Sequence, residues 1–217
     1  VAHELRTPLT SLHMAIHLCV DETVGPLNEK QASLLFAARE DCQRLQTMVD
    51  DLLDLSRIQS GRVEMKRHPV SVRSLLEGAC NLHQATAAEK GIHLTADLQA
   101  LSEEKVSADP ERIGLVLANF ITNALRHTDS GGFISLRATG QDNLMRFEVS
   151  DTGEGIAPEH QARVFDKFFR VPGSQTSGVG LGLSICREVI EAHDGEIGVQ
   201  SQPGQGSMFW FTLPLAV

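Results

Sequence analysis

The sequence predicts a multidomain chain: an all-α helical hairpin that pairs with a second copy as a dimeric four-helix bundle, followed by an α/β two-layer sandwich. Two patterns carry this prediction. Apolar residues recur at alternating spacings of three and four through about the first 55 residues, as in a coiled coil. Beyond about residue 72, strand-like and helix-like segments follow one another. We expect the hairpin over 1–59, a linker over 60–71 and the sandwich over 72–217.

The first helix of the hairpin should run from the start of the chain to about Asp21, where Gly25 and Pro26 break it. A second helix should begin near Asn28. The two apolar seams consist of Leu5, Leu9, Leu12, Ile16 and Cys19, and of Leu35, Ala38, Cys42, Leu45, Val49 and Leu52. A lone hairpin cannot bury stripes this wide, so we expect a homodimer. The alternative is that the hairpin packs onto the rest of its own chain.

Helices and strands alternate after the linker. Asp109-Pro110-Glu111 is a strong helix start, because it places a capping side chain, a proline and an acid at the positions that favour each. The expected helices cover about 72–90, 110–127, 158–165 and 181–193. The expected strands cover 92–98, a short segment near 106, 133–139, 144–150, 196–201 and 207–213.

Composition excludes some functions. The 217 residues carry 19 basic and 28 acidic side chains, a net charge of −9, which argues against a nucleic-acid partner. The four cysteines form no CxxC pair and are expected to be reduced thiols of a cytoplasmic protein. The sequence contains no run of 18 apolar residues, so we expect contact with a membrane only through a segment upstream of Val1.

His3, Glu4 and Thr7 should lie on the outward face of the first helix. With Leu5 and Leu12 at heptad position d, these three polar residues occupy b, c and f. An imidazole beside a carboxylate on a wet face is accessible to a reaction partner. The alternative is an ordinary solvated helix face.

Asp151 begins a second candidate site, in the loop DTGEGI at the end of a strand. A carboxylate here can accept hydrogen bonds, for instance from an exocyclic amine, and Gly153 and Gly155 would let the backbone approach a flat ligand. A plain glycine turn is the alternative.

The glycines at 178, 180 and 182 lead directly into a helical segment. Free amides and the helix dipole at such a terminus favour phosphate groups. The spacing is that of neither a Rossmann fingerprint nor a P-loop, so a nucleotide site would be of another type.

Asn119 and Asn123 share one helix face, with Arg126 one turn further on. Amide oxygens suit Mg²⁺, which takes few protein ligands together with waters and phosphate oxygens. Buried asparagines that join helices are the alternative.

Taken in order, these segments resemble the transmitter core of bacterial two-component sensor histidine kinases over nearly the whole chain. AHELRTPLTSL resembles the phosphoacceptor box, and LQTMVDDLLDLSRIQSG the second helix of the dimerisation and phosphotransfer domain (HisKA). DPERIGLVLANFITNALRHT resembles the N box. DTGEGI, VFDKFFR and SGVGLGLSI resemble the G1, F and G2 boxes, and HDGEIGVQSQPGQGSMFWFTLP the end of the ATP-binding domain.

The resemblance implies a Bergerat (GHKL) ATP site, shared with gyrase, Hsp90 and MutL, and a role for each matching residue. His3 would be the phosphoacceptor, Glu4 its base, and Thr7 would orient a water for phosphatase action. Asn123 would bind Mg²⁺ and Asp151 the adenine amine. The other residues implied at the ATP site are Asn119, Arg126, His127, Gly153, Gly155, Ile156, Phe165, Lys167, Arg170, Gly178, Gly180, Leu181, Gly182 and Leu183.

The implied activity is ATP-dependent autophosphorylation on His3, followed by phosphoryl transfer to an Asp of a response regulator. The chain would then be the cytoplasmic part of an inner-membrane sensor. Three positions depart from the family pattern: Ala2 replaces the more usual Ser, Arg126-His127 replaces Lys-Tyr, and Asp194 replaces Gly. The ATP-lid segment between Phe169 and Gly178 is short.

Two other functions compete with this one. His3-Glu4 begins an HExxH zinc-peptidase pattern, but Thr7 stands where the second histidine ligand is required. A scaffold without turnover is the third possibility, although every residue type needed for catalysis is present.

Overall fold

The structure, a computed structural model, describes the backbone of residues 2–59, 65–99, 103–172 and 180–216. The side chains of residues 2–6, 47, 51 and 54–59 also lie outside this description. The chain divides into two compact units, residues 1–57 and 58–217.

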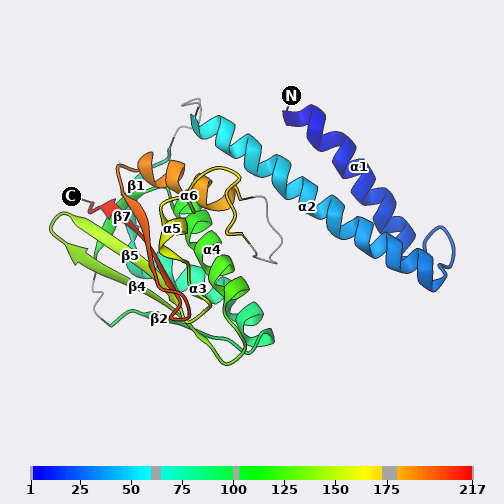
Figure 1. Ribbon diagram of the computed structural model, residues 1–217. Coiled ribbons are helices and arrows are strands. Elements are labelled where there is room, and N and C mark those ends of the chain that lie inside the picture. The colour runs from blue at the N-terminus through cyan, green and yellow to red at the C-terminus, as the bar shows by residue number, and fades with distance from the viewer. Residues whose placement is uncertain (1, 60–64, 100–102, 173–179, 217) are drawn as a thin grey trace. The chain divides into compact units, whose positions relative to one another are not determined.

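The first unit is a helical hairpin formed by α1 (Ala2–Val20) and α2 (Glu29–Gln59), as expected (Figure 1). A reciprocal capping box begins α2: the Asn28 side chain accepts the Gln31 N–H at 2.9 Å, and the Gln31 side chain accepts the Asn28 N–H at 3.0 Å. Leu9 and Cys42 are buried between the helices. The seam prediction therefore holds at this contact.

The second unit is built on a five-stranded sheet in the order β2-β4-β5-β7-β6. β2 runs parallel to β4, and every other neighbouring pair is antiparallel. The strands are β2 (His93–Asp97), β4 (Phe133–Gln141), β5 (Leu144–Asp151), β6 (Ile197–Ser201) and β7 (Ser207–Pro214).

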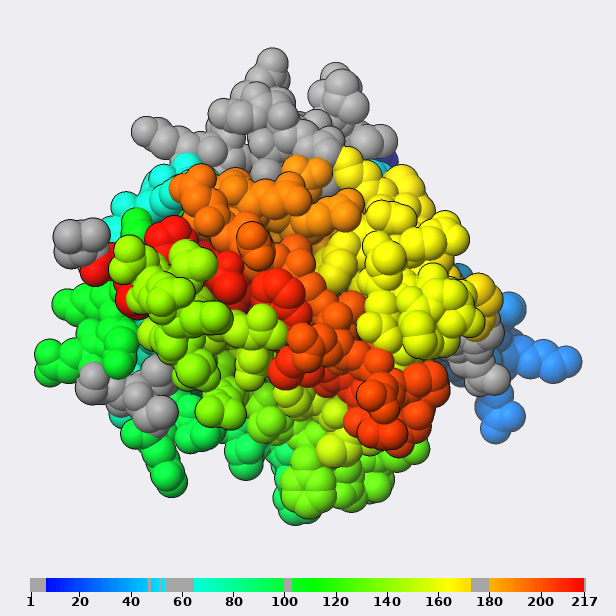
Figure 2. All heavy atoms as spheres, turned by 60° about the vertical axis from the view of Figure 1, so that its left-hand side comes forward, coloured from blue at the N-terminus to red at the C-terminus, as the bar shows by residue number. Residues whose placement is uncertain are grey.

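Helices α3 (Val72–Glu89), α4 (Pro110–His127) and α6 (Gly182–Glu191) cover one face of this sheet (Figure 1). Burial alternates along the strands, so Phe147 and Phe211 point toward the helices, where their rings stack at 4.8 Å and Phe120 joins them. On the other face, β5 (yellow-green), β7 (red) and β6 (orange-red) lie at the surface (Figure 2). The two-layer α/β sandwich is confirmed.

Local signals place α4 as predicted. Asp109 caps the helix by accepting the N–H groups of Glu111 and Arg112, and Pro110 occupies the first helical position. The long amphipathic stripe of α4 packs between α3 and α6. This helix carries Asn119, Asn123 and Arg126, so its start fixes where those side chains lie.

Two elements differ from expectation. β1 (His68–Ser71) lies within the segment expected as a linker and pairs antiparallel with β3 (Lys105–Ala108). Four residues give no alternation long enough to reveal such a strand. The helix expected over 158–165 is the shorter α5 (Pro158–Gln161), because the backbone continues in turns with N–H groups of Arg163 and Asp166 bonded three residues back.

The segment before β1 is held against the rest of the second unit by hydrogen bonds and an ion pair. The N–H of Lys66 donates to Asp109 Oδ2 at 3.1 Å, and Arg67 forms an ion pair with Asp194 at 2.6 Å and donates to the Ala192 carbonyl. Asp194 has a left-handed φ of 58°, a conformation that glycine adopts more readily than other residues.

Candidate functional site

Asp151 ends β5 and is held rigidly. Its side chain is 9% exposed. Oδ1 accepts the backbone N–H of Gly153 at 2.8 Å and that of Ser207 at 3.2 Å. Oδ2 accepts no hydrogen bond from the described residues. One carboxylate oxygen is thus fixed by the backbone, while the other keeps its capacity for a ligand donor.

The groups around Asp151 have opposing effects on the pKa of its carboxyl group. Burial raises the pKa of this carboxyl, because the charged form loses solvation. The N–H groups of Gly153 and Ser207, and the charge of His127, act the other way and lower the pKa. The nearby Glu154 carboxylate adds a small further increase, so the pKa of Asp151 is raised on balance and the backbone hydrogen bonds only partly offset the effect of burial.

Three glycines of this region pack against backbone rather than face open space. A Cβ on Gly153 would lie 2.2 Å from the His127 carbonyl oxygen, and one on Gly155, at φ 72°, would lie 2.0 Å from the Gln202 oxygen. A Cβ on Gly206 would lie 1.9 Å from the Asp151 oxygen. The loop 151–156 therefore packs closely between the end of α4 and the β6–β7 turn. The predicted approach of Gly153 and Gly155 to a flat ligand stays a prediction.

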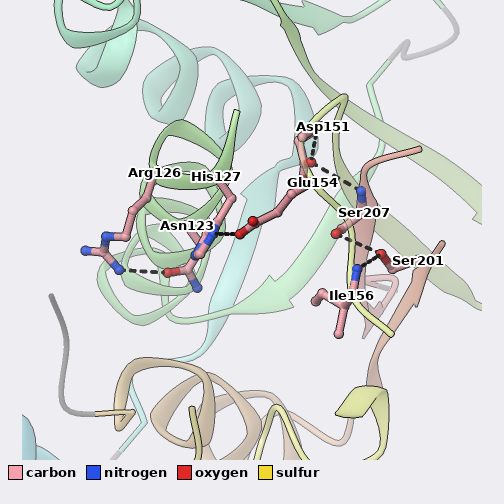
Figure 3. A network of polar contacts seen from close by, with 9 residues as sticks. Asn123, Arg126, His127, Asp151, Glu154, Ile156, Ser201 and Ser207 are labelled. Carbon is pink, nitrogen blue, oxygen red and sulfur yellow. Dashed lines mark hydrogen bonds and ion pairs between the residues drawn. The ribbon is translucent and has the colours of Figure 1, made fainter. Parts of the chain in front are cut away.

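Side chains that the sequence analysis missed complete the loop (Figure 3). Ser201 Oγ accepts the N–H of Ile156 at 2.7 Å and lies 3.0 Å from Ser207 Oγ. Gln161 Nε2 donates to the carbonyls of Ile156 and Ser201. Ser201 lies 45 residues beyond Ile156 and 40 beyond Gln161, so no local pattern could have revealed the contacts that Ser201 makes with these two residues.

The C-terminal half of α4 presents the predicted polar face. Arg126 Nη1 donates to Asn123 Oδ1 at 3.3 Å (Figure 3). Asn119 Nδ2 donates to the Leu115 carbonyl, and a Cβ on Gly182 would lie 2.6 Å from Asn119 Oδ1. The start of α6 therefore meets the middle of α4.

His127 links α4 to the loop of Asp151. Its Nδ1 lies 2.6 Å from Glu154 Oε1 (Figure 3). The next residue, Thr128, has a buried hydroxyl without a hydrogen-bond partner among the described residues. An unsatisfied buried hydroxyl costs about 1–3 kcal/mol, which a water or a polar ligand atom would recover.

The G2 segment is described from Gly180 onward, and Gly178 lies outside the described residues. Gly180 adopts φ 77° and its carbonyl accepts the Phe168 N–H at 2.9 Å. Leu181, the N-cap residue of α6, is buried, and its side chain accepts no hydrogen bond from the helix. The backbone N–H groups of Gly182 and Leu183 therefore have no capping acceptor from Leu181. Such a terminus suits an anion.

The F-box residues divide into packed and exposed ones. Phe165 is buried against Phe209, with ring centroids 6.2 Å apart. Lys167 pairs with Glu188 at 3.7 Å, and Arg170 is exposed. Phe165 is thus a core residue that shapes the region, whereas the charged side chains are accessible to phosphates.

The helical hairpin carries the other predicted residues. His3 and Glu4 lie on α1, but their side chains are outside the described residues. Thr7 is exposed, one turn further along α1. The structure brings together the α4, Asp151 and α6 residues of the second unit, and it describes the hairpin residues as a separate group.

The described residues contain neither a metal-binding cluster nor a membrane-spanning helix. Among the described residues, no group of three or more His, Cys, Asp or Glu side chains could hold a metal ion. The same part of the chain contains no helix of the length and apolar character that a membrane span requires. None of the four cysteines forms a disulfide bond, and Cys42, Cys80 and Cys186 are buried.

Comparison with known families agrees with this geometry. Residues 108–217 match the family described as histidine kinase-, DNA gyrase B- and HSP90-like ATPase, and residues 1–61 match the His kinase A (phospho-acceptor) domain. The two matches thus describe a phosphoacceptor domain followed by an ATPase-type domain. The chain belongs to the histidine kinase family.

Similar proteins include individual sensors. The chain is 37% identical to the alginate biosynthesis sensor protein KinB of Pseudomonas aeruginosa over 99% of its length and 36% of that protein. It is 35% identical to the circadian input-output histidine kinase CikA of Synechococcus elongatus, over 99% of the chain and 29% of that protein. The chain therefore spans about a third of the length of these relatives.

Solved structures show the same architecture. Full-length ShkA in complex with AMPPNP matches 100% of this chain and 45% of its own, with a TM-score of 0.82 and 36% identity. The catalytic domain of the histidine kinase ThkA matches 69% of this chain and 96% of its own, with a TM-score of 0.62 and 28% identity. The likeness to ShkA extends over both units.

Proposed function

We propose that this chain is an ATP-dependent protein-histidine kinase that phosphorylates itself on His3 and passes the phosphoryl group to an Asp of a response regulator. The observation that carries the proposal is Asp151, which is buried and fixed through Oδ1 while Oδ2 can still accept a donor. An adenine amine is a donor of that kind. The complex of ShkA with AMPPNP supports an ATP-type ligand for this fold.

The nucleotide would lie between three segments. Asp151 would take the adenine amine, and the N–H groups at the start of α6 would face the phosphates. Arg126 and the exposed Arg170 would add positive charge near the phosphates. Phosphoryl transfer requires mainly positioning and charge neutralisation, which these groups can supply.

Mg²⁺ fits the residues of α4. The Asn123 amide oxygen already holds the positively charged Arg126 at 3.3 Å, so it lies where a cation is favoured. Asn123 would hold the metal, with Asn119 supporting it, and the ion would neutralise phosphate charge when bound. Arg126 must release the Asn123 oxygen for this to occur.

His3 would act as the nucleophile. A neutral imidazole nitrogen would form a bond to the γ-phosphorus as the bond to the β–γ bridging oxygen breaks and ADP leaves. Glu4, the next residue on α1, would take the proton of the other ring nitrogen. In transfer to the regulator, an oxygen of an Asp carboxylate would form a bond to the phosphorus as the bond between the phosphorus and the His3 nitrogen breaks. The imidazole would regain its proton and leave in the neutral form.

A homodimer would form through the hairpin. Leu12, Leu45 and Leu52 belong to the predicted seams, yet Leu12 is 56% exposed within one chain and the other two are also exposed. Apolar seams that a single hairpin leaves open favour pairing with a second copy as a four-helix bundle.

We also propose a phosphatase role for Thr7, whose hydroxyl would orient a water toward the phospho-Asp of the regulator. Its exposed position on α1 supports access to a partner. The full protein would be attached to the membrane only through an upstream segment, and the part described here would lie in the cytoplasm.

A phosphotransfer experiment tests this function. The purified chain is incubated with radiolabelled ATP and Mg²⁺, and a purified receiver domain is then added. The proposal expects label on the chain that is stable in base, lost in acid, and moved to the receiver. Absence of label on the chain under saturating ATP would contradict it.

A further inference from the structure

Glu154 lies where three segments of the second unit meet. Its carboxylate Oε1 is 2.6 Å from Nδ1 of His127, the last residue of α4 (Figure 3). Its backbone N–H donates to the His127 carbonyl at 3.3 Å, and its own carbonyl accepts the N–H of Gly204 at 2.7 Å. One residue therefore joins the end of α4, the loop of Asp151 and the β6–β7 turn.

The contact between Glu154 and His127 is better suited to orienting the imidazole ring than to stabilising the fold. The two side chains are 68% and 32% exposed, so solvent weakens their attraction. Geometry is more restrictive, because a hydrogen bond at Nδ1 sets both the tautomer and the plane of the imidazole ring. The ring stands on the helix that carries Asn119 and Asn123.

The loop has little freedom in one direction. Gly153 lies so close to the His127 carbonyl that even a Cβ would be 2.2 Å from its oxygen. Packing thus prevents the loop from moving toward α4. The hydrogen bonds of Glu154 oppose movement of the loop away from α4. Of these bonds, a substitution of Glu154 can remove only the one between its side chain and His127.

We propose that Glu154 is a positioning residue of the nucleotide site, acting through His127. Glu154 would keep the distance between the loop of Asp151 and the end of α4 constant. Asp151, which would bind the adenine amine, and the α4 residues near the phosphates would then fit the same nucleotide. This inference rests on the proposed ATP site. Glu154 lies outside the set of residues to which the family resemblance assigns a role.

A double-mutant cycle tests the proposal on the whole chain. ATP affinity is measured by calorimetry for the wild type, Glu154→Ala, His127→Ala and the double variant. Glu154→Ala is expected to weaken binding by about 3- to 10-fold, and the double variant to bind no more weakly than His127→Ala alone, because the glutamate acts through the histidine. The maximal autophosphorylation rate at saturating ATP should change much less than the affinity.

Two further variants separate positioning from general effects. Glu154→Gln should restore most of the affinity, because the amide oxygen can still accept the Nδ1 proton. Glu159→Ala, an exposed acid in the first turn of α5, removes the same charge elsewhere and should leave the affinity unchanged. Urea unfolding of each variant shows whether a loss of affinity reflects a loss of stability.

Several results would overturn the proposal. Wild-type affinity in Glu154→Ala, fully additive losses in the double variant, or no rescue by Gln would each contradict it. If the wild type binds ATP and Asp151→Asn does not, these results leave the nucleotide site intact and remove only the role of Glu154. If the wild type itself fails to bind ATP, the proposed function fails with it.

Discussion

The Oδ1 atom of Asp151 accepts the backbone N–H of Ser207 at 3.2 Å, across the sheet from β5 to β7. The same oxygen accepts the N–H of Gly153 at 2.8 Å. Two donors from distant parts of the chain thus fix which carboxylate oxygen is used by the protein and which is left for a ligand.

Asp151→Asn is expected to lose most of its ATP affinity. The asparagine oxygen would stay on the two backbone N–H groups, so the amide nitrogen would face the adenine amine and two donors would meet. A lost hydrogen bond with an unpaired donor costs about 2–3 kcal/mol, roughly 30- to 150-fold in affinity. Calorimetry with ATP measures this, and unchanged affinity would refute the assignment of Asp151.

Gly153→Ala is expected to destabilise the second unit by about 1–3 kcal/mol, because the new Cβ would overlap the His127 carbonyl oxygen. The matched control is Gly140→Ala, where the nearest atom to a Cβ is the Met145 methyl at 3.9 Å. Urea midpoints of the two variants provide the comparison. Equal stability would show that the loop can move away from α4 at no cost.

His193 should make stability depend on pH. The ring is fully buried, accepts the Asp109 N–H at 3.0 Å through Nε2, and bonds the Val189 carbonyl at 2.8 Å through Nδ1. Burial lowers its pKa, with smaller opposing effects from the Val189 hydrogen bond and the charges of Asp109 and Asp194, and a further lowering by Arg67. The neutral ring is therefore the form that fits the fold.

The sign follows from linkage. In the unfolded chain a histidine is protonated near pH 6.5, which is above the pKa of His193 in the folded protein. The contribution of the neutral His193 ring to the free energy of unfolding is therefore complete above about pH 6.5 and is lost as the pH falls below that value. His193→Gln should be less stable at pH 7.5 and lose less additional stability between pH 6.5 and 5. Urea titrations at each pH test this, and parallel pH profiles would rule it out.

Thr7→Ala is expected to keep autophosphorylation and to slow dephosphorylation of the regulator by about tenfold or more, because the hydroxyl would orient the attacking water. The alternative is that Thr7 hydrogen-bonds the helix backbone near Pro8. In that case both activities should fall modestly and together. Measuring both rates on one preparation distinguishes the two outcomes.

Much of the fold was predictable because its signals are local. The start of α4 follows from Asp109, Pro110 and Glu111, and the β4–β5 hairpin follows from alternation on either side of a polar turn. β1 escaped prediction, because its evidence is its pairing with β3, more than 30 residues away. Backbone partners far along the chain cannot be read from local periodicity.

The candidate site, like the fold, was predictable only where its sequence signals are local. Asp151 and the asparagines of α4 are recognisable from their sequence patterns. The contacts of Ser207, Ser201 and Glu154 are not, because each depends on a partner that only the folded sheet brings close. Gly153 and Gly155 also pack closely against backbone, a requirement that their sequence pattern did not indicate, and their predicted approach to a ligand stays a prediction.

The most direct test of the account is the position of the phosphoryl group. The wild type and His3→Gln are incubated with radiolabelled ATP and Mg²⁺, and acid-labile label and ATP affinity are measured on both. The account predicts labelled wild type, unlabelled His3→Gln, and equal ATP affinity, because the acceptor lies in the helical hairpin and the nucleotide site in the second unit. Labelling of His3→Gln at the wild-type level would contradict it.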